Sequence, residues 1–472
     1  MLRIFLLLVL GLALQKTVGQ SPNVIFINVD DLGYKDMGYM GSSFYETPNI
    51  DRLAHEGMVF TQAYAGAANC APSRACLLSG LNTPKHGIYT VENSDRGDAR
   101  TRRIIPTTNQ TVLADSIITL AELFSSQGYI TGTFGKWHLG EDPTTQGFDV
   151  NVGGSHRGNP GKNGYFSPYN VDELSDGPDG EYLTDRLTTE AIQFLRANQS
   201  KSFFLYLPYY TVHTPLIGKD SLVKKFERKE SGLGQDNPVY AAMIASLDEN
   251  VGRLLSEIDR LQLRENTIVV LTSDNGGIRD ISYQSPLRAG KGSYYEGGIR
   301  VPLTIRWPNK VTPQTICTTP VSNLDFYPTF RAILGINSSA EELNGVDISP
   351  LLAGEDIDER PLFWHFPIYL QAYNPKEDGG RDPLFRTRPG SVVRKGKWKL
   401  HHYYEDNSLE LYNLEEDLGE TQNVASDFSE VSEELYQLLV DWLDTNRTEH
   451  SFSPNPAYDA TFEQQLKDKK LQ

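Results

Sequence analysis

Five short segments of the chain are apolar and rich in β-branched residues, which is the pattern of buried strands. They are Asn23–Val29, Tyr129–Phe134, Ser202–Leu207, Asn266–Thr272 and Val301–Trp307. Helical patterns of apolar residues lie among them, over Ile50–His55, Val112–Ser126, Asp185–Ala197, Val239–Leu263 and Asn323–Leu334. Strands that alternate with helices predict an α/β fold, with a large, mainly parallel central sheet flanked by helices.

The pattern changes after about Leu352. Ser391–His402 and Leu409–Leu414 have the alternation of antiparallel strands with one polar face, and Val431–Leu443 has the pattern of a closing helix. We therefore expect a large α/β domain over residues 20–355 and a smaller C-terminal α+β subdomain, with an antiparallel sheet and a helix, over residues 356–472.

The first nineteen residues have the pattern of a signal peptide. Arg3 precedes the apolar run Ile4–Leu14, and Thr17-Val18-Gly19 offers small residues for cleavage before Gln20. A membrane anchor is the alternative, but the run is short for a bilayer span. We expect residues 1–19 to be removed and the protein to be exported, either periplasmic or secreted. No later stretch is apolar enough for a membrane span in the mature chain.

Composition narrows the range of functions. The 472 residues carry 44 Lys and Arg against 61 Asp and Glu, a formal net charge of −17, which argues against nucleic acid as a partner. A polyanionic substrate would therefore need a locally basic site. The three cysteines, Cys70, Cys76 and Cys317, are too few for a disulfide scaffold, and their odd number leaves at least one unpaired.

Polar clusters follow four of the predicted strands. These are Asp30-Asp31, Gly135–Gly140, Thr211–Pro215 and Ser273–Gly277. The carboxyl ends of parallel strands share one edge of a sheet, so these clusters are expected to converge there. Asp30, Asp31, Asp274 and Asn275 offer only oxygen ligands, which suit Ca²⁺ or Mg²⁺ better than Zn²⁺. The alternative is that they only cap a helix and form a turn.

The rarest pattern is Cys70-Ala71-Pro72-Ser73-Arg74, followed by Ser79-Gly80. Pro72 marks the start of a helix, and the backbone donors and positive dipole at such a start favour an anion. Arg74 adds a fixed positive fork. The alternatives are a buried structural cysteine and a disulfide between Cys70 and Cys76.

Together these motifs resemble the signature of the type I, formylglycine-dependent sulfatases of the alkaline-phosphatase-like superfamily. The resemblance covers nearly the whole mature chain. Its matching segments are Asn23–Gly33, Thr47–Phe60, Cys70–Gly80, Gly135–Gly140, Ser273–Gly276, Lys291 with Glu296-Gly297-Gly298, and Leu411–Leu414 with Glu420 and Asn423. It implies the alkaline-phosphatase-like fold for the large domain and the activity of a sulfuric ester hydrolase.

The resemblance also implies a set of catalytic roles. A formylglycine-generating enzyme would oxidise Cys70 to Cα-formylglycine, whose hydrate attacks sulfur and ligates the metal. Two histidines would move protons: His213, alone or with Lys291, to the leaving oxygen, and His138 from the second hydroxyl. The metal, Ca²⁺ or alternatively Mg²⁺, would be held by Asp30, Asp31, Cys70, Asp274 and Asn275. Arg74, Lys136 and Lys291 would neutralise sulfate oxygens.

Two positions depart from the family pattern. Leu216 stands where many relatives have the second histidine of H-x-P-H, and Lys85 stands where many have the arginine of R-H-G. The first departure bears on substrate contacts.

The substrate is expected to be a sulfated carbohydrate, such as algal ulvan, carrageenan or fucoidan, or a glycosaminoglycan. The loop from His156 mixes basic, aromatic and glycine residues, so we expect His156 and Arg157 to bind substrate, together with Arg279. Trp364-His365 and Arg381–Arg388 are further candidates for the rim of the site. Two other readings stay open: a phosphonate or phosphate ester hydrolase of the same superfamily, and a non-catalytic glycan-binding protein that is never oxidised at Cys70.

Overall fold

The computed structural model describes residues 21–161, 163–336 and 343–472. In this part of the chain the central sheet has nine strands in the order β4-β3-β5-β1-β6-β7-β2-β8, with β9 pairing beside β2. The strands are β1 (Asn23–Val29), β2 (Met58–Tyr64), β3 (Ile130–Phe134), β4 (Val150–Val152), β5 (Phe203–Pro208), β6 (Thr267–Ser273), β7 (Arg300–Arg306), β8 (Thr315–Cys317) and β9 (Val321–Ser322).

The sheet is mainly parallel, as the sequence predicts. β1 pairs in parallel with β5 and β6, and β3 pairs in parallel with β5 and β4. The exception is β7, which is antiparallel to both β6 and β2, so that β2 runs in the same direction as β6. Because β7 is reversed, the segment that precedes it lies at the edge where the parallel strands end.

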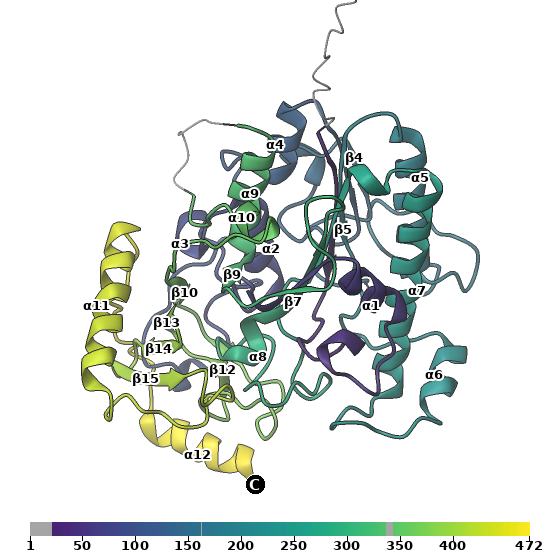
Figure 1. The fold of residues 1–472 in the computed structure, drawn as a ribbon. Helices are drawn as coiled ribbons and strands as arrows, with labels where there is room; N and C mark the ends of the chain where they lie inside the picture. Colours follow the sequence, from purple (N-terminus) through teal and green to yellow (C-terminus); the bar gives the residue numbers. More distant parts are fainter. Residues whose placement is uncertain (1–20, 162, 337–342) are drawn as a thin grey trace, which may run out of the picture.

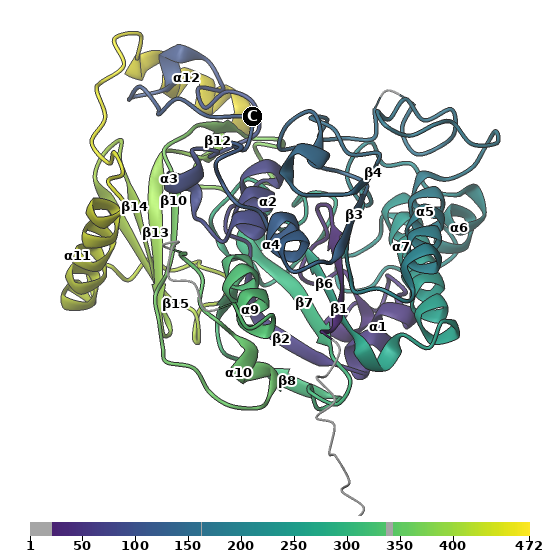
Figure 2. The same cartoon turned by 90° about the horizontal axis from the view of Figure 1, so that it is seen from above.

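Helices cover both faces of the sheet, because successive residues of a strand point to opposite sides. Ile25 and Ile27 of β1 pack in one apolar core with α1, α5, α6 and α7, whereas Val24 and Phe26 pack in another with α2, α4, α9 and α10. Figures 1 and 2 show these two layers of helices on either side of the strands. The helices are α1 (Pro48–His55), α2 (Cys70–Ser79), α3 (Thr83–His86), α4 (Leu120–Ser126), α5 (Leu183–Asn198), α6 (Asp220–Phe226), α7 (Pro238–Arg260), α8 (Glu296–Ile299), α9 (Phe326–Ile333) and α10 (Ser349–Leu352). Short 3₁₀ helices are η1 (Gly38–Met40), η2 (Ala99–Thr101), η3 (Pro143–Gln146), η4 (Arg264–Asn266) and η5 (Asn323–Asp325).

One helix is much shorter than its apolar pattern predicts. The prediction of a helix over Val112–Ser126 is wrong for its first half, because α4 begins only at Leu120. Thr119 and Glu122 form a capping box there, in which each side chain accepts a hydrogen bond from the other residue's backbone N–H. Upstream, the N–H of Leu113 donates to the carbonyl of Leu139 rather than to a helix.

The C-terminal part forms a second, antiparallel sheet, as expected. Its order is β10-β13-β14-β15, and α11 packs on it through an apolar cluster that includes Leu400 and Leu439. The segment predicted as one strand, Ser391–His402, is a hairpin of two strands, with Gly396 in the left-handed region at its turn. These elements are β10 (Leu362–Phe366), β13 (Gly390–Lys395), β14 (Trp398–Tyr403), β15 (Ser408–Asn413) and α11 (Ser429–Thr445).

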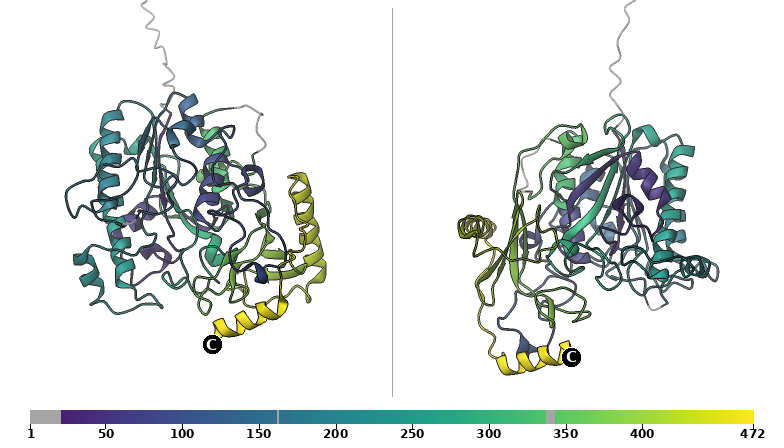
Figure 3. Two further views of the ribbon diagram at one scale, coloured as in Figure 1. Left: turned by 180° about the vertical axis from the view of Figure 1, so that it is seen from behind. Right: turned by 60° about the horizontal axis from the view of Figure 1, so that its bottom comes forward.

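A pair of short strands and the final helix lie outside this sheet. β11 (Leu370–Gln371) and β12 (Phe385–Thr387) form a small antiparallel pair, and the final helix α12 (Ala460–Leu471) contacts η2. Figure 3 shows α12 at the lower end of the molecule, beside the blue segment that contains η2. The division at residue 356 stays a prediction, and the predicted signal peptide lies outside the described residues. Among the helices that the structure describes, none has the length and apolar content to cross a bilayer.

Candidate active site

The residues that follow β1 and β6 lie together at the carboxyl edge of the main sheet. The N–H of Asp30 donates to the carbonyl of Thr211 (3.1 Å), and the N–H of Asp274 donates to the carbonyl of Val29 (3.0 Å). These bonds tie the ends of β1, β5 and β6 to one another. Carboxylate oxygens of Asp30, Asp31 and Asp274 consequently lie within 4.8 Å of one another, all buried.

This oxygen-rich cluster fits a hard divalent cation. The Nδ2 of Asn275 donates to Asp31 Oδ1 (2.8 Å), while its Oδ1 is buried without a hydrogen-bond partner. Buried polar atoms normally have a partner, so an orphaned amide oxygen beside three carboxylates marks a position for a cation. Asp30, Asp31, Asp274 and Asn275 are therefore the residues that would hold it.

The sulfur of Cys70 faces the same carboxylates. Cys70 is the first residue of α2, which follows the carboxyl end of β2, and its Sγ lies 3.5 Å from Asp30 Oδ1 and 3.9 Å from Asp31 Oδ1. Burial raises the pKa of this thiol to about 12, so it keeps its proton at neutral pH. Cys70, Cys76 and Cys317 are all free and buried, which removes the alternative of a disulfide between Cys70 and Cys76.

Three buried cations surround the thiol and its carboxylates. Arg74 lies one turn further along α2, and its Nε and Nη2 lie 3.0 and 2.9 Å from Asp274 Oδ2. Lys136 Nζ is 2.7 Å from Asp30 Oδ2, and Lys291 Nζ is 2.7 Å from Asp31 Oδ2. Burial disfavours the charge of Asp31, but Lys291 holds the pKa of that carboxyl below its usual range.

Backbone geometry explains how the two lysines reach this edge. Gly135 follows β3 with a φ of 126°, and a Cβ there would lie 2.2 Å from the carbonyl oxygen of Pro208. Only glycine permits this approach, which lets the N–H of Lys136 donate to the same carbonyl (2.7 Å). Lys291 lies in the segment before β7, and the reversed direction of that strand brings this segment to the site.

The two predicted catalytic histidines also lie at this edge. His138 has a φ of 64°, an uncommon left-handed conformation, and its Nδ1 is buried without a partner. Burial, and then Lys136, hold the pKa of His138 well below its usual range. His213 Nδ1 is 2.6 Å from the carbonyl of Thr214, and its Nε2 is 3.7 Å from Asp31 Oδ2. Burial, and then Lys291, lower the pKa of His213 to about 4.

A cavity of about 740 Å³ opens above Cys70. Of the predicted substrate residues, His156 and Arg157 line it, each paired with a carboxylate: His156 Nδ1 with Glu141 (2.9 Å) and Arg157 Nε with Asp172 (2.9 Å). Arg279 does not line it, and its guanidinium lies 5.1 Å from the ring centroid of Tyr283.

The C-terminal subdomain supplies part of the cavity wall, although not through Trp364-His365. The indole N–H of Trp364 donates to the carbonyl of Ala65 (2.8 Å), and His365 Nδ1 lies 2.8 Å from the hydroxyl of Ser391, both away from the cavity. Within the predicted Arg381–Arg388 segment, Arg386 is the residue that lines it.

Sequence reasoning missed several other lining residues. They include Asn69, Thr90, Glu92, Arg96 and Tyr373. Asn69 is the N-cap residue of α2 and could have been found by extending the Cys70 pattern by one position. The others lie in loops that are far from the motifs in sequence, and no local pattern points them toward the site.

Comparisons with known proteins agree with this geometry. Residues 22–336, more than half of the chain, match the family model described as Sulfatase, and residues 290–447 match the model described as N-sulphoglucosamine sulphohydrolase, C-terminal. The second match covers the whole of the four-stranded antiparallel sheet and α11.

Individual relatives extend over most of the chain. A sulfatase of Formosa agariphila is 33% identical, with 88% of this chain and 86% of that protein covered. Arylsulfatase A of Homo sapiens is 30% identical, with coverages of 92% and 89%. The crystal structure of Ps i-CgsB in complex with k-i-k-neocarrahexaose superposes with a TM-score of 0.74 at 28% identity, covering 96% of this chain and 99% of that one.

These matches confirm the fold and the enzyme class that the sequence motifs imply. They span both the main sheet, whose carboxyl edge carries Cys70 and the acidic cluster, and the C-terminal segment whose Tyr373 and Arg386 line the cavity. The chain belongs to the sulfatase family, whose members hydrolyse sulfuric esters.

Proposed function

We propose that this chain is an exported sulfatase, periplasmic or secreted, that removes sulfate esters from a sulfated carbohydrate during polysaccharide degradation. The observation that carries the proposal is the position of Cys70, at the start of α2 and at the floor of the cavity, with three carboxylates and three cations around it. The carbohydrate class is supported by the neocarrahexaose bound to a structural relative. An open cavity with basic walls suits an acidic glycan, whether algal or a glycosaminoglycan.

The proposed site includes two groups that the chain itself does not encode. Asp30, Asp31, Asp274 and Asn275 would hold a divalent cation, Ca²⁺ or alternatively Mg²⁺, which when bound polarises a sulfate oxygen and lowers the pKa of a bound hydroxyl. A formylglycine-generating enzyme would convert Cys70 to formylglycine, which supplies as its hydrate a nucleophilic hydroxyl that also ligates the cation.

The cations of the chain stabilise the charge of the sulfate group. Arg74, Lys136 and Lys291 are fixed by hydrogen bonds and ion pairs before substrate arrives, so they need no reorganisation as charge shifts onto the sulfate oxygens. Their burial strengthens each of these interactions relative to water.

The two histidines move protons at defined atoms. Nδ1 of His213 donates its hydrogen to the Thr214 carbonyl, so Nε2 is the atom that can take up a second proton. An anionic sulfate beside the ring favours this protonated imidazole. Nε2 then gives its proton to the departing sugar oxygen, and the ring returns to the neutral form with its hydrogen on Nδ1. His138 lies on the cavity wall, and its Nδ1 has no hydrogen-bond partner. We assign to it the role of accepting the proton from the second hydroxyl of the formylglycine hydrate. Lys291, beside His213, supports the same leaving oxygen by its charge.

The decisive experiment measures the release of inorganic sulfate from a panel of sulfated oligosaccharides and polysaccharides. The chain is co-expressed with a formylglycine-generating enzyme, the aldehyde is verified by mass spectrometry, and Cys70→Ala is the control. Release that vanishes in the control supports the proposal and identifies the sugar class. An aldehyde-bearing protein that hydrolyses phosphate or phosphonate esters in preference to every sulfate ester would overturn it.

A further inference from the structure

The charged side chains that line the cavity differ in one respect, which is whether a carboxylate accompanies them. Five of the seven Lys, Arg and His residues in the lining lie within 4.0 Å of a carboxylate. These pairs are Arg96 with Glu92, His156 with Glu141, Arg157 with Asp172, and both His213 and Lys291 with Asp31. The other two are His138, which is uncharged because its pKa lies well below its usual range, and Arg386 of β12, which is the charged one.

Arg386 is buried and has no such partner. Its exposed fraction is 7%, and no carboxylate within the described ranges lies inside 4.0 Å of its guanidinium. Its Nε has no hydrogen-bond partner, and Nη1 reaches only the carbonyl of Lys291, at 3.5 Å. A buried charge without a partner is costly, and burial lowers the pKa of Arg386 below its usual range, although arginine stays protonated.

Two neighbouring residues, Tyr373 and Gly292, hold the guanidinium of Arg386 in the cavity wall. The guanidinium carbon lies 3.4 Å from the ring centroid of Tyr373, which is itself half-exposed in the cavity wall. Gly292 lies against it with a φ of 83°, and a Cβ at Gly292 would come within 2.6 Å of Arg386 Nε. The chain therefore leaves room for this guanidinium beside Lys291 and covers it with an aromatic ring.

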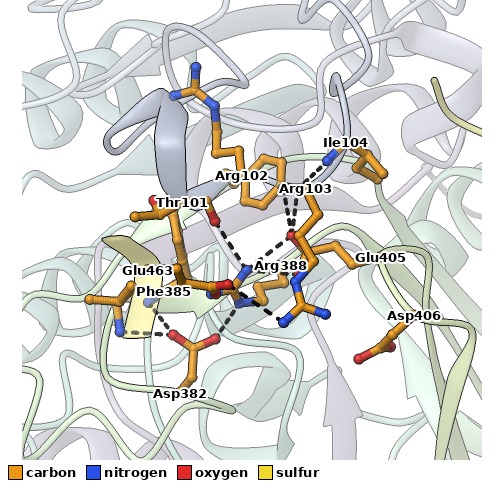
Figure 4. A network of polar contacts seen from close by, with 12 residues as sticks. Thr101, Arg102, Arg103, Ile104, Asp382, Phe385, Arg388, Glu405, Asp406 and Glu463 are labelled. Carbon is orange, nitrogen blue, oxygen red and sulfur yellow. Dashed lines mark hydrogen bonds and ion pairs between the residues drawn. The ribbon is translucent and has the colours of Figure 1, made fainter. Parts of the chain in front are cut away.

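A neighbouring arginine shows that this segment does not lack carboxylates. Arg388, two residues along, is bound by Asp382, Glu405 and Glu463, and Figure 4 shows these acids around its guanidinium. Arg388 thus anchors the end of β12 to α12 and to the turn that follows β14. Arg386 extends from the same anchored strand into the cavity without a carboxylate of its own.

We propose that Arg386 binds a second anionic substituent of the substrate, a sulfate ester or a carboxylate, while the scissile sulfate faces Cys70. The proposal rests on the proposed function and narrows its substrate class to carbohydrates that carry two anionic groups close together. The scissile sulfate already faces Arg74, Lys136 and Lys291, so the guanidinium at the wall is available for another oxyanion. The planar fork of arginine suits either oxyanion.

The test measures binding rather than turnover, on Cys70→Ala protein in the presence of Ca²⁺. Calorimetry compares galactan tetrasaccharides that carry one or two sulfates per disaccharide, and 6-sulfated chondroitin disaccharides with the uronate carboxyl intact or reduced to an alcohol. In at least one pair the second anion should tighten binding about tenfold or more. The first pair tests a sulfate partner and the second a carboxylate partner.

The variant Arg386→Gln should reduce that difference to less than about twofold. The matched control is Arg381→Gln, from the same segment, whose guanidinium pairs with Asp406 and does not line the cavity; it should keep the full difference. Because Arg386→Gln removes a buried charge that has no carboxylate within 4.0 Å, its melting temperature should equal or exceed that of the parent.

Three results would overturn the proposal: no effect of the second anion in either pair, a difference that survives Arg386→Gln, or a large fall in melting temperature in that variant. None of them depends on sulfate release. A protein that discriminates the second anion through Arg386 but hydrolyses no sulfate ester would contradict the proposed function alone.

Discussion

Two buried clusters of charge show what separates a structural network from a reaction site. Arg388 has a carboxylate for each nitrogen of its guanidinium, and none of its polar atoms is left without a partner. The cluster around Cys70 contains three carboxylates and three cations, yet Asn275 Oδ1 and His138 Nδ1 are buried and unpartnered. The guanidinium of Arg388 is satisfied by the chain's own carboxylates, whereas the cluster around Cys70 needs ligands to satisfy its buried atoms.

This difference has a physical basis. A fully paired buried network holds elements in register, and here it ties the end of β12 to α12 and to the turn that follows β14 (Figure 4). A cluster with orphaned atoms costs folding free energy, and such a cost persists where a cation and a substrate later satisfy it. The predictions below test whether the two clusters respond differently to substitution.

The largest effect is expected for Asp274→Asn, because Asp274 is both a predicted metal ligand and the partner of Arg74. Sulfate release should fall at least 1,000-fold, as for loss of a metal site. Addition of Ca²⁺ should raise the melting temperature of the parent but not of this variant, since binding to the folded state alone stabilises it. The control is Asp382→Asn in the Arg388 network, which should keep the Ca²⁺ response. An equal Ca²⁺ response in both variants would contradict the assignment.

The next effect is expected for His138→Ala. Loss of a general base costs about 100- to 10,000-fold in turnover. Its melting temperature should change little, since Nδ1 makes no hydrogen bond that the substitution removes. His86→Gln is the matched control: that histidine is also buried, but its Nε2 lies 3.4 Å from Cys76 Sγ and it does not line the cavity. The His86→Gln variant should have a lower melting temperature and keep turnover within about threefold. A loss of turnover in His86→Gln, or a loss of stability alone in His138→Ala, would contradict the comparison.

In the network around Arg388, substitution is expected to lower the stability of the fold and not the turnover. Glu463→Gln breaks the contact of α12 with Arg388 and should cost about 3 kcal/mol of unfolding free energy at pH 7, measured by urea denaturation. Its effect on kcat/KM should stay within about twofold. The control is Glu434→Gln, an exposed partner of Lys395, which should cost less than about 0.5 kcal/mol. Loss of turnover without loss of stability would instead show that Glu463 acts in the reaction and not in the structural network around Arg388.

The same variant has a pH signature. Burial disfavours the charge of Glu463, but Lys467, Tyr458 and Arg388 together lower its pKa to about 2, from 4.5. The unfolded chain therefore takes up the proton first as the pH falls. The stability that Glu463 contributes is present above pH 4.5 and is lost between pH 4.5 and 2. Glu463→Gln should flatten the pH dependence of the unfolding free energy in this window, and an unchanged slope would argue against the ion pair.

Much of the main sheet could be predicted from sequence. The strand Asn23–Val29 has the predicted bounds, because a mainly apolar segment ends at two aspartates. β2 was missed, because Thr61 and Gln62 interrupt its apolar pattern. The helix predicted from Val112 begins only at Leu120, because the capping box of Thr119 and Glu122 sets its start, whereas apolar spacing alone extends the pattern upstream.

The residues of the site also fall into two groups, those that local sequence predicts and those that it does not. Cys70, Lys136 and Asp274 follow strand ends in recognisable motifs, so local sequence was sufficient to bring them together. Tyr373 and Arg386 reach the cavity only through the pairing of β11 with β12 and the anchoring of Arg388. Those contacts join residues that are distant in sequence, and no local pattern specifies them.

The smallest expected effects test whether an orphaned atom alone marks a functional residue. Arg279 has a buried Nη1 without a partner but lies outside the cavity, whereas Arg157 is paired and lines it. The sequence predicts that both arginines bind substrate. Only Arg157 lines the cavity, so the structure favours Arg157 as the substrate-binding residue. Arg157→Ala should raise KM for an oligosaccharide about fivefold to tenfold and leave a small aryl sulfate nearly unaffected, because one rim contact contributes modestly. Arg279→Ala should change both within about twofold. A larger oligosaccharide effect at Arg279 would mean that an unpartnered atom predicts function better than contact with the cavity does.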